Sequence, residues 1–271
     1  MMPLGIRKSA VSGSFYPESC SKLKAYFREF NAAFDKISIK KKILDIKPKA
    51  IIVPHAGYIY SGFTANFAYR FLQHSKPKRI IVIGPSHHYY FKGISASYFE
   101  SYETPCGNIE IDTPYLFALA KKFNISFQPE AHTKEHSTEV QMPFIKQYFP
   151  KAKVIELIYG DITVKPLANI IEALLHNPDN AVVISSDLSH FYPLPKAEML
   201  DKHCLKAVAN LDIPELKRGC EACGIIGIEA MIMAAKKLGL SSKLLDYRTS
   251  EYVTKDKNSV VGYLSAMFYE K

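Results

Sequence analysis

Four short runs of the chain are almost continuously apolar and rich in β-branched residues. Strands that are buried on both faces of a sheet have this pattern. The runs cover residues 50–53, 79–83, 153–158 and 181–184. We therefore predict four buried strands at these positions.

Segments with the apolar spacing of helices lie before, between and after these runs. We predict helices at residues 21–34, 62–74, 114–123, 138–148, 166–175, 195–210 and 224–238. Two late extended runs, residues 243–249 and 260–268, predict further strands. Because strand and helix alternate, the pattern favours a layered α/β fold with a largely parallel sheet.

The composition, 48% hydrophobic and 23% charged residues in a chain of 271, is that of an ordinary globular protein. It excludes collagen-like, coiled-coil and disordered proteins. The chain has no internal repeat, low-complexity tract or long linker. We therefore expect a single domain over residues 1–271.

Two further features predict the compartment. No apolar run approaches the roughly 18–20 residues that cross a bilayer, and the first residues lack the apolar stretch of a signal peptide. The five cysteines are odd in number and irregularly spaced, which argues against a disulfide framework and fits a reducing compartment. We expect a soluble, cytoplasmic protein without a membrane partner.

The formal net charge is +9, from 35 Lys and Arg against 26 Asp and Glu. Between Lys36 and Lys49 six lysines face a single acid, Asp45. A lysine-rich stretch without arginine or aromatic residues is typical of a solvated connector rather than a nucleic-acid patch. The sequence therefore predicts no nucleic-acid partner.

Histidine-bearing segments follow three of the four predicted strands. Ligands of open α/β sheets sit beyond the carboxyl ends of the strands, so these segments are expected to meet in one site. Imidazole is the commonest protein ligand for metals, and two or three imidazoles with an anionic ligand suit iron, zinc or copper. The segments carry His55 and Tyr58, then His87 and His88, then Asp187 and His190.

Two residues compete for the place of the anionic ligand. Asp187 is one, although the spacing Asp187-x-x-His190 also suits an acid that orients a catalytic imidazole. Cys223 is the other, because a thiol at the start of a helix is expected to have a lowered pKa and to be a thiolate. Cys220-x-x-Cys223 lacks the second pair of a zinc clip, so we interpret Cys220 as incidental.

A further cluster spans residues 135–143. It has the pattern of a helix start, with Ser137 as a possible cap and Glu139 in the first turn. On a helix, His136 and Glu139 would face the same way. The cluster is thus explained either as a cap or as part of the site.

Together these motifs resemble the Memo family along essentially the whole chain. The motifs are Ser9–Pro17, Pro54-His55-Ala56-Gly57-Tyr58, Gly84-Pro85-Ser86-His87-His88, Glu135-His136-Ser137-x-Glu139, Ser185-Ser186-Asp187-x-Ser189-His190 and Cys223-Gly224. The resemblance implies a three-layer single domain with a largely parallel or mixed central sheet, similar to the LigB-like class III extradiol dioxygenases. In those enzymes two histidines and a glutamate hold Fe(II).

The resemblance also assigns roles to the residues of the site. His55 and His87 map onto the two histidine ligands, and Cys223 onto the position of the glutamate. His190 maps onto the acid/base histidine, with Asp187 beside it. The expected lining of the substrate pocket is His136, Glu139, His88 and Tyr58.

The exchange of a carboxylate for a thiolate makes the site softer, so Fe(II) is expected first and copper or zinc as alternatives. It argues against catechol cleavage and leaves redox or dioxygenase-like chemistry on an unidentified small molecule or peptide. A binding module for a (phospho)peptide is the alternative. The resemblance further implies a possible role in a modification system with AMMECR1-domain or radical-SAM proteins, and a zinc hydrolase is a weaker option.

Overall fold

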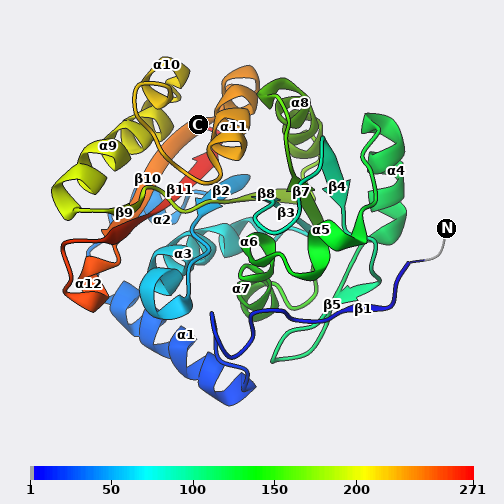
Figure 1. Ribbon diagram of the computed structural model, residues 1–271, viewed down its shortest axis with the longest axis horizontal. Helices are drawn as coiled ribbons and strands as arrows, with labels where there is room; N and C mark the ends of the chain where they lie inside the picture. Colours follow the sequence, from blue (N-terminus) through cyan, green and yellow to red (C-terminus); the bar gives the residue numbers. More distant parts are fainter. Residues whose placement is uncertain (1–2) are drawn as a thin grey trace.

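A twisted central sheet organises the computed structural model, which describes residues 3–271 (Figure 1). Its strand order is β10, β11, β2, β8, β3, β7, β4, and β9 pairs with β11 beside this path. The bounds in that order are Ser241–Thr249, Val260–Tyr269, Ala50–Val53, Asn180–Ser185, Arg79–Pro85, Lys153–Tyr159 and Ile94–Ala96, with β9 at His190–Tyr192.

The sheet is mixed. Its centre, β2, β8, β3 and β7, is parallel, whereas β11 runs antiparallel to both β2 and β10, and β4 antiparallel to β7. The four apolar runs form the parallel centre and the two late runs form β10 and β11, so these predictions are confirmed. Because Val53 is paired with Ser185 and Ile83 with Ile184, the strands that carry the histidine segments end side by side.

Helices cover both faces of the sheet and complete three layers (Figure 1). One face carries α1 (Cys20–Asp35), α3 (Tyr58–Leu72), α6 (His136–Glu139) and α7 (Met142–Tyr148); the other carries α8 (Val164–Leu175), α9 (Leu194–Asn210), α10 (Ile213–Leu216) and α11 (Ile225–Lys237). The remaining elements are α2 (Lys41–Leu44), η1 (Gln73–Ser75), α4 (Thr113–Phe123), α5 (Pro129–Thr133), α12 (Glu251–Thr254) and a small sheet of β1 (Ile6–Arg7), β5 (Ser101–Tyr102) and β6 (Ile109–Glu110).

The helix predicted at residues 138–148 is divided into α6 and α7. Pro143 lies in the first turn of α7, where its missing N–H costs nothing. A continuous helix would need that N–H to reach the carbonyl of Glu139. The other predicted helices are present, with ends that differ by a few residues.

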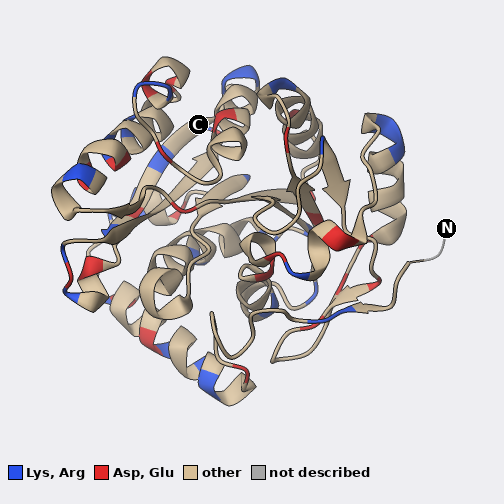
Figure 2. Cartoon of the chain, in the orientation of Figure 1, with Lys and Arg blue, Asp and Glu red and all other residues tan. Residues whose placement is uncertain are grey.

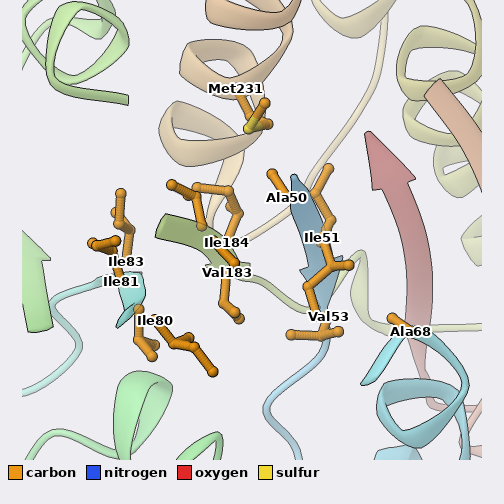
Figure 3. Packing of buried hydrophobic residues seen from close by; sticks show 14 of the residues in the cluster. Ala50, Ile51, Val53, Ala68, Ile80, Ile81, Ile83, Val183, Ile184 and Met231 are labelled. Atoms are coloured by element: carbon orange, nitrogen blue, oxygen red, sulfur yellow. The ribbon is translucent and has the colours of Figure 1, made fainter. Parts of the chain in front are cut away.

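The side chains of the parallel strands are packed between the helical layers. Figure 3 shows Ile51 of β2, Ile81 of β3 and Ile184 of β8 between Met231 of α11 and Ala68 of α3. All five are completely buried. Burial on both faces explains why these strands lack the alternation of a half-exposed sheet.

Charged side chains lie on elements all around the molecule, α1, α4 and α9 among them (Figure 2). Within residues 3–271 we find no helix with the length and apolar character needed to span a membrane. The lysine-rich stretch from Lys36 to Lys49 contains the short helix α2, and most of its lysines are exposed. Ile37 is also exposed, whereas the other three isoleucines of the stretch are half-buried.

The expectation of unpaired cysteines is wrong. Cys20 is bonded to Cys106, and Cys204 to Cys220, each pair with its Cα atoms 4.8 Å apart. The first pair is 86 residues apart in sequence, so only the fold brings it together. Cys220 is therefore half of a disulfide rather than incidental, and Cys223 is the one free cysteine among the five.

A buried ion pair attaches the N-terminal segment to helix α6. The guanidinium of Arg7 is bonded to the carboxylate of Glu139, and the side chains are 1% and 0% exposed. Arg7 also donates to the carbonyls of His132 (2.7 Å) and Glu135 (2.8 Å). Glu139 accepts hydrogen bonds from the hydroxyl of Tyr16 (2.8 Å) and from the backbone of residues 10 and 11. The segment 132–139 is thereby held from the side of the N-terminus.

We expect Arg7→Met to lower the free energy of unfolding by about 3–5 kcal/mol, because the carboxylate of Glu139 would stay buried without its partner. Urea denaturation followed by circular dichroism measures this loss. The matched control is Lys8→Met, which removes an exposed ion pair to Glu103 and should cost about 1 kcal/mol at most. Equal losses in the two variants would contradict the role given to Arg7.

Candidate metal centre

His55 lies in the segment that leaves β2, and a chain of hydrogen bonds holds its ring. Its Nδ1 is 3.0 Å from the hydroxyl oxygen of Ser185 at the end of β8. The side-chain amide of Gln141 donates to that same oxygen (2.9 Å) and to the carbonyl of Pro54 (2.9 Å). The Ser185 hydroxyl itself donates to the carbonyl of Ser137.

These contacts determine the tautomer of His55. The single proton of the Ser185 hydroxyl is used by Ser137, so the hydroxyl can only accept from the imidazole. Nδ1 of His55 must therefore carry the proton, and Nε2 keeps its lone pair. Burial lowers the pKa of His55 well below its ordinary value, and the neighbouring His87 and His136 add to this shift, so the ring is neutral.

His87, just beyond β3, is held by the carboxylate of Glu135. One oxygen of Glu135 is 3.0 Å from Nδ1 of His87 and also accepts the N–H of Ser137 (2.9 Å). The other oxygen accepts the backbone N–H of His87 (2.5 Å). Burial raises the pKa of Glu135, but the hydrogen bond and charge of His87 outweigh it and lower the pKa to about 2. An ionised carboxylate only accepts, so Nδ1 of His87 is the donor and Nε2 is left as the ligand atom.

His136 joins these two histidines. One ring nitrogen from each of His55, His87 and His136 lies within 4.8 Å of the other two. Burial lowers the pKa of His136 to about 4, although the carboxylate of Glu135 opposes this shift. His136, expected to line the substrate pocket, thus belongs to a cluster in which the imidazoles of His55 and His136 are neutral. Such a cluster fits a metal ion, which binds the neutral form of the ring.

Cys223 reaches the same centre from the loop before α11. Its Sγ lies 3.3 Å from Nε2 of His55 and 3.3 Å from the backbone nitrogen of Asp187. The expected thiolate is not supported: burial raises the pKa of Cys223 to about 12, and the nearby Asp187 adds to the shift. The loss of solvation outweighs the field of the helix start, so the thiol is protonated unless a metal ion replaces the proton.

Asp187 is directed to His55 instead of His190. Its carboxylate accepts the backbone N–H of His55 (2.8 Å) and lies 3.9 Å from Nε2 of the same residue. Burial raises the pKa of Asp187 to about 7, although backbone N–H groups of His55 and Ala56 oppose the shift. His190, at the start of β9, is half-buried, and burial lowers the pKa of its imidazole.

The other predicted pocket residues lie in two different environments. Tyr58 is 1% exposed, and its hydroxyl donates to the carbonyl of Val140 (2.9 Å). Glu139 is occupied by Arg7 and the N-terminal backbone. Both side chains therefore pack inside the protein rather than line a pocket. His88 is exposed at the rim, with its Nε2 3.2 Å from Nδ1 of His136.

Three residues that hold the histidines have no role in the sequence analysis. They are Glu135, Ser185 and Gln141. Ser137 was expected to cap α6, but the cap is Glu135, whose side chain accepts the N–H of Ser137. Besides their places in the motifs of the resemblance, the signal for Glu135 was its position directly before His136, and for Ser185 its position directly after an apolar run.

Two glycines of the motifs allow the segments of the centre to approach one another. A Cβ on Gly84 would lie 2.7 Å from the hydroxyl oxygen of Ser137, and a Cβ on Gly224 would lie 2.6 Å from the Cβ of Ser186. Neither position has a positive φ, so close approach rather than a special backbone angle explains the glycines.

This chain is similar to proteins of one family over nearly its full length. A model described as Memo-like protein matches residues 7–267. A MEMO1 family protein of Aquifex aeolicus is 33% identical over 97% of this chain and 99% of its own length, and one of Methanosarcina barkeri is 32% identical over 95% and 98%. The crystal structure of the uncharacterized protein JW3007 from Escherichia coli K12 shares the fold, with a TM-score of 0.55, 12% identity and coverage of 82% of this chain and 100% of that one.

We expect Glu135→Gln to disturb His87 and weaken metal binding by roughly 10- to 100-fold. Both oxygens of Glu135 accept backbone N–H groups, so an amide NH₂ in either place would face another donor. Two-bond proton–nitrogen spectra of the metal-free protein should show an unprotonated Nε2 for His87 in the wild type and a mixture of tautomers in the variant. Metal affinity is measured by competition with a chelator.

Glu215→Gln is the matched control, because Glu215 lies 3.0 Å from Nδ1 of His203 in a histidine–carboxylate pair outside the centre. It should leave the spectrum of His87 and the metal affinity unchanged. Wild-type behaviour of Glu135→Gln in both measurements would show that Glu135 does not position His87.

We expect iodoacetamide to alkylate Cys223 of the metal-free protein slowly, at a rate that rises about tenfold per pH unit up to at least about pH 10. The raised pKa keeps the thiolate fraction small throughout this range. Mass spectrometry of the unreduced protein measures the rate, with Cys223→Ser as the unlabelled control. A plateau at about pH 8.5, the ordinary pKa of cysteine, would contradict the protonated thiol.

Proposed function

This chain belongs to the Memo-like protein family, and we propose that it binds a redox metal ion, iron or copper, at His55 and His87. His136 and Cys223 are the further donors for this ion. We propose that the loaded protein carries out redox or dioxygenase-like chemistry on an unidentified substrate. The observation that supports this most directly is the group of three imidazoles whose ring nitrogens lie within 4.8 Å of one another.

The hydrogen bonds around the centre support metal binding over a purely structural cluster. His55 and His87 are each held through Nδ1 by an oxygen of the scaffold. Nε2 of His55 lies 3.3 Å from Sγ of Cys223, which is itself a metal donor. A histidine ligand held from behind by a carboxylate is the usual arrangement around protein-bound metals. No proton has to leave the imidazole of His55 when an ion binds, because its pKa is lowered well below the ordinary value.

The donor types restrict the choice of ion. Neutral imidazole and thiolate favour iron, copper or zinc over magnesium or calcium, which prefer oxygen. Bound iron or copper would supply one-electron and oxygen chemistry. The half-buried, neutral imidazole of His190 can accept a proton from a substrate that enters the centre.

Recognition of a peptide is the second candidate function. Two aromatic side chains beside the histidines, Tyr90 and Phe191, are 77% and 75% exposed, as in a surface that packs against a partner. The imidazoles of His55 and His136 are neutral, however, and Arg7 is occupied by Glu139, so these groups offer no positive charge to a phosphate. We therefore rank metal chemistry first.

We expect anaerobically purified wild-type protein to contain stoichiometric iron or copper, and His55→Ala to lose it. The loss of affinity should be at least the roughly 10- to 100-fold of a change next to the ligands. Elemental analysis and chelator competition measure it, and a parallel comparison of His136→Ala with Cys223→Ala identifies the third ligand. Oxygen uptake with a panel of reduced substrates then tests the chemistry.

His203→Ala is the control for the loss of a partly buried histidine away from the centre, and it should keep its metal. Equal, near-zero metal in the wild type and in His55→Ala would contradict the proposal. Stoichiometric zinc in place of iron or copper would refute the redox chemistry and leave the binding site standing.

A further inference from the structure

A groove lies at the other end of the sheet from the histidines. The groove has a volume of about 1070 Å³ and is formed by the stretch before β2, by α3, by the start of β10 and by the end of β11. His55 follows the last residue of β2, whereas this groove is lined by residues that precede the first. The groove and the proposed metal centre are therefore separate sites.

The floor of the groove is apolar and its rim is basic. Ile43, Phe71 and Leu244 are among the apolar side chains of the floor, and each comes from a different element. The rim carries five lysines: Lys40, Lys42, Lys47, Lys243 and Lys271. Such a combination suits an occupant with both apolar and anionic groups.

The lysines of the rim are free to bind an external anion. Within residues 3–271, none of the five takes part in an ion pair of 4.0 Å or less. Two acids also line the groove, and one of them, Glu270, is bonded to Lys49 (2.6 Å). Among the side chains of the lining, Asp45 is thus the one remaining acid that could offset the positive charge.

The lining argues against a nucleic acid or a small phosphorylated ligand. It contains no arginine, the residue that recognises phosphate through two parallel hydrogen bonds. Its phenylalanines, Phe67 and Phe71, are 6% and 1% exposed, and the third aromatic residue of the lining, Tyr269, is half-buried. The lining therefore lacks the series of open rings on which successive bases stack. The volume also lies at or above the range of about 300–1,000 Å³ for small-molecule pockets.

We propose that this groove binds an acidic peptide segment of a partner protein, with its apolar side chains on the floor and its carboxylates on the lysine rim. The stretch from Lys36 to Lys49 is then part of a recognition surface, and its isoleucines and lysines serve the two halves of the contact. Rim lysines would speed association and make binding sensitive to salt.

Selection of a random linear peptide library displayed on phage tests this proposal on the full chain. The bait is the wild type, and K40E/K42E/K47E is used for counter-selection. We expect enriched sequences that combine Asp or Glu with large apolar residues. The synthetic peptides should bind at least about tenfold more weakly to the variant and lose affinity with rising salt.

The matched control is K196E/K202E/K206E, which makes the same change of charge on exposed positions of α9. It should bind the peptides like the wild type. K40Q/K42Q/K47Q, which removes the charge without adding acids, should give an intermediate loss, and thermal melting confirms that each variant is folded. Enriched peptides without acidic residues, no enrichment over the counter-selection, or equal binding to both charge-reversed variants would overturn the proposal. Tight binding of RNA or anionic vesicles that needs the same lysines, without peptide binding, would also overturn it.

Discussion

The buried ion pair between Arg7 and Glu139 is the interaction on which the arrangement of the candidate centre depends. Two charges inside a protein are tolerated only when each has a full set of partners. Here the partners are the backbone of the N-terminal segment on one side and the carbonyls of His132 and Glu135 on the other. The ion pair thus holds in place a segment whose own helices, α5 and α6, are too short to be stable alone.

That segment positions the histidines through the carboxylate of Glu135 and the backbone of Ser137. Glu135 holds His87 by ring and backbone, and Ser137 of the same segment orients Ser185 behind His55. Burial keeps His55 and His136 neutral and the thiol of Cys223 protonated. The lone pairs of the imidazole Nε2 atoms are therefore oriented to bind a cation before it arrives. The thiol of Cys223 would release its proton when the cation binds.

The two ends of the sheet differ in chemistry for a simple topological reason. Short loops with histidines follow the carboxyl ends of the parallel strands. The stretch before β2 places lysines and isoleucines at the opposite end of these strands. One end holds a group of three imidazoles, of which only His55 is buried, and the other an open groove with unpaired charges. A partner bound in the groove would leave the approach to the histidines open.

The sequence by itself determined the layered fold and the place of the site, because both follow from local signals. Runs of apolar residues identify the buried strands, and the histidines that follow Val53 and Ile83 come together because β2 and β3 both lie beside β8 and end at the same side of the sheet. The third imidazole of the group is His136, which comes from a segment outside the three that follow the strands. Only the tertiary structure decided which cysteines form disulfides. It also showed that Ser185 and Glu135 determine the tautomers of His55 and His87. Tyr58 and Glu139 are buried in the interior, where they bind other parts of the chain. The tertiary structure also reversed the expected ionisation of Cys223, because solvation depends on what surrounds a group and not on its neighbours in sequence.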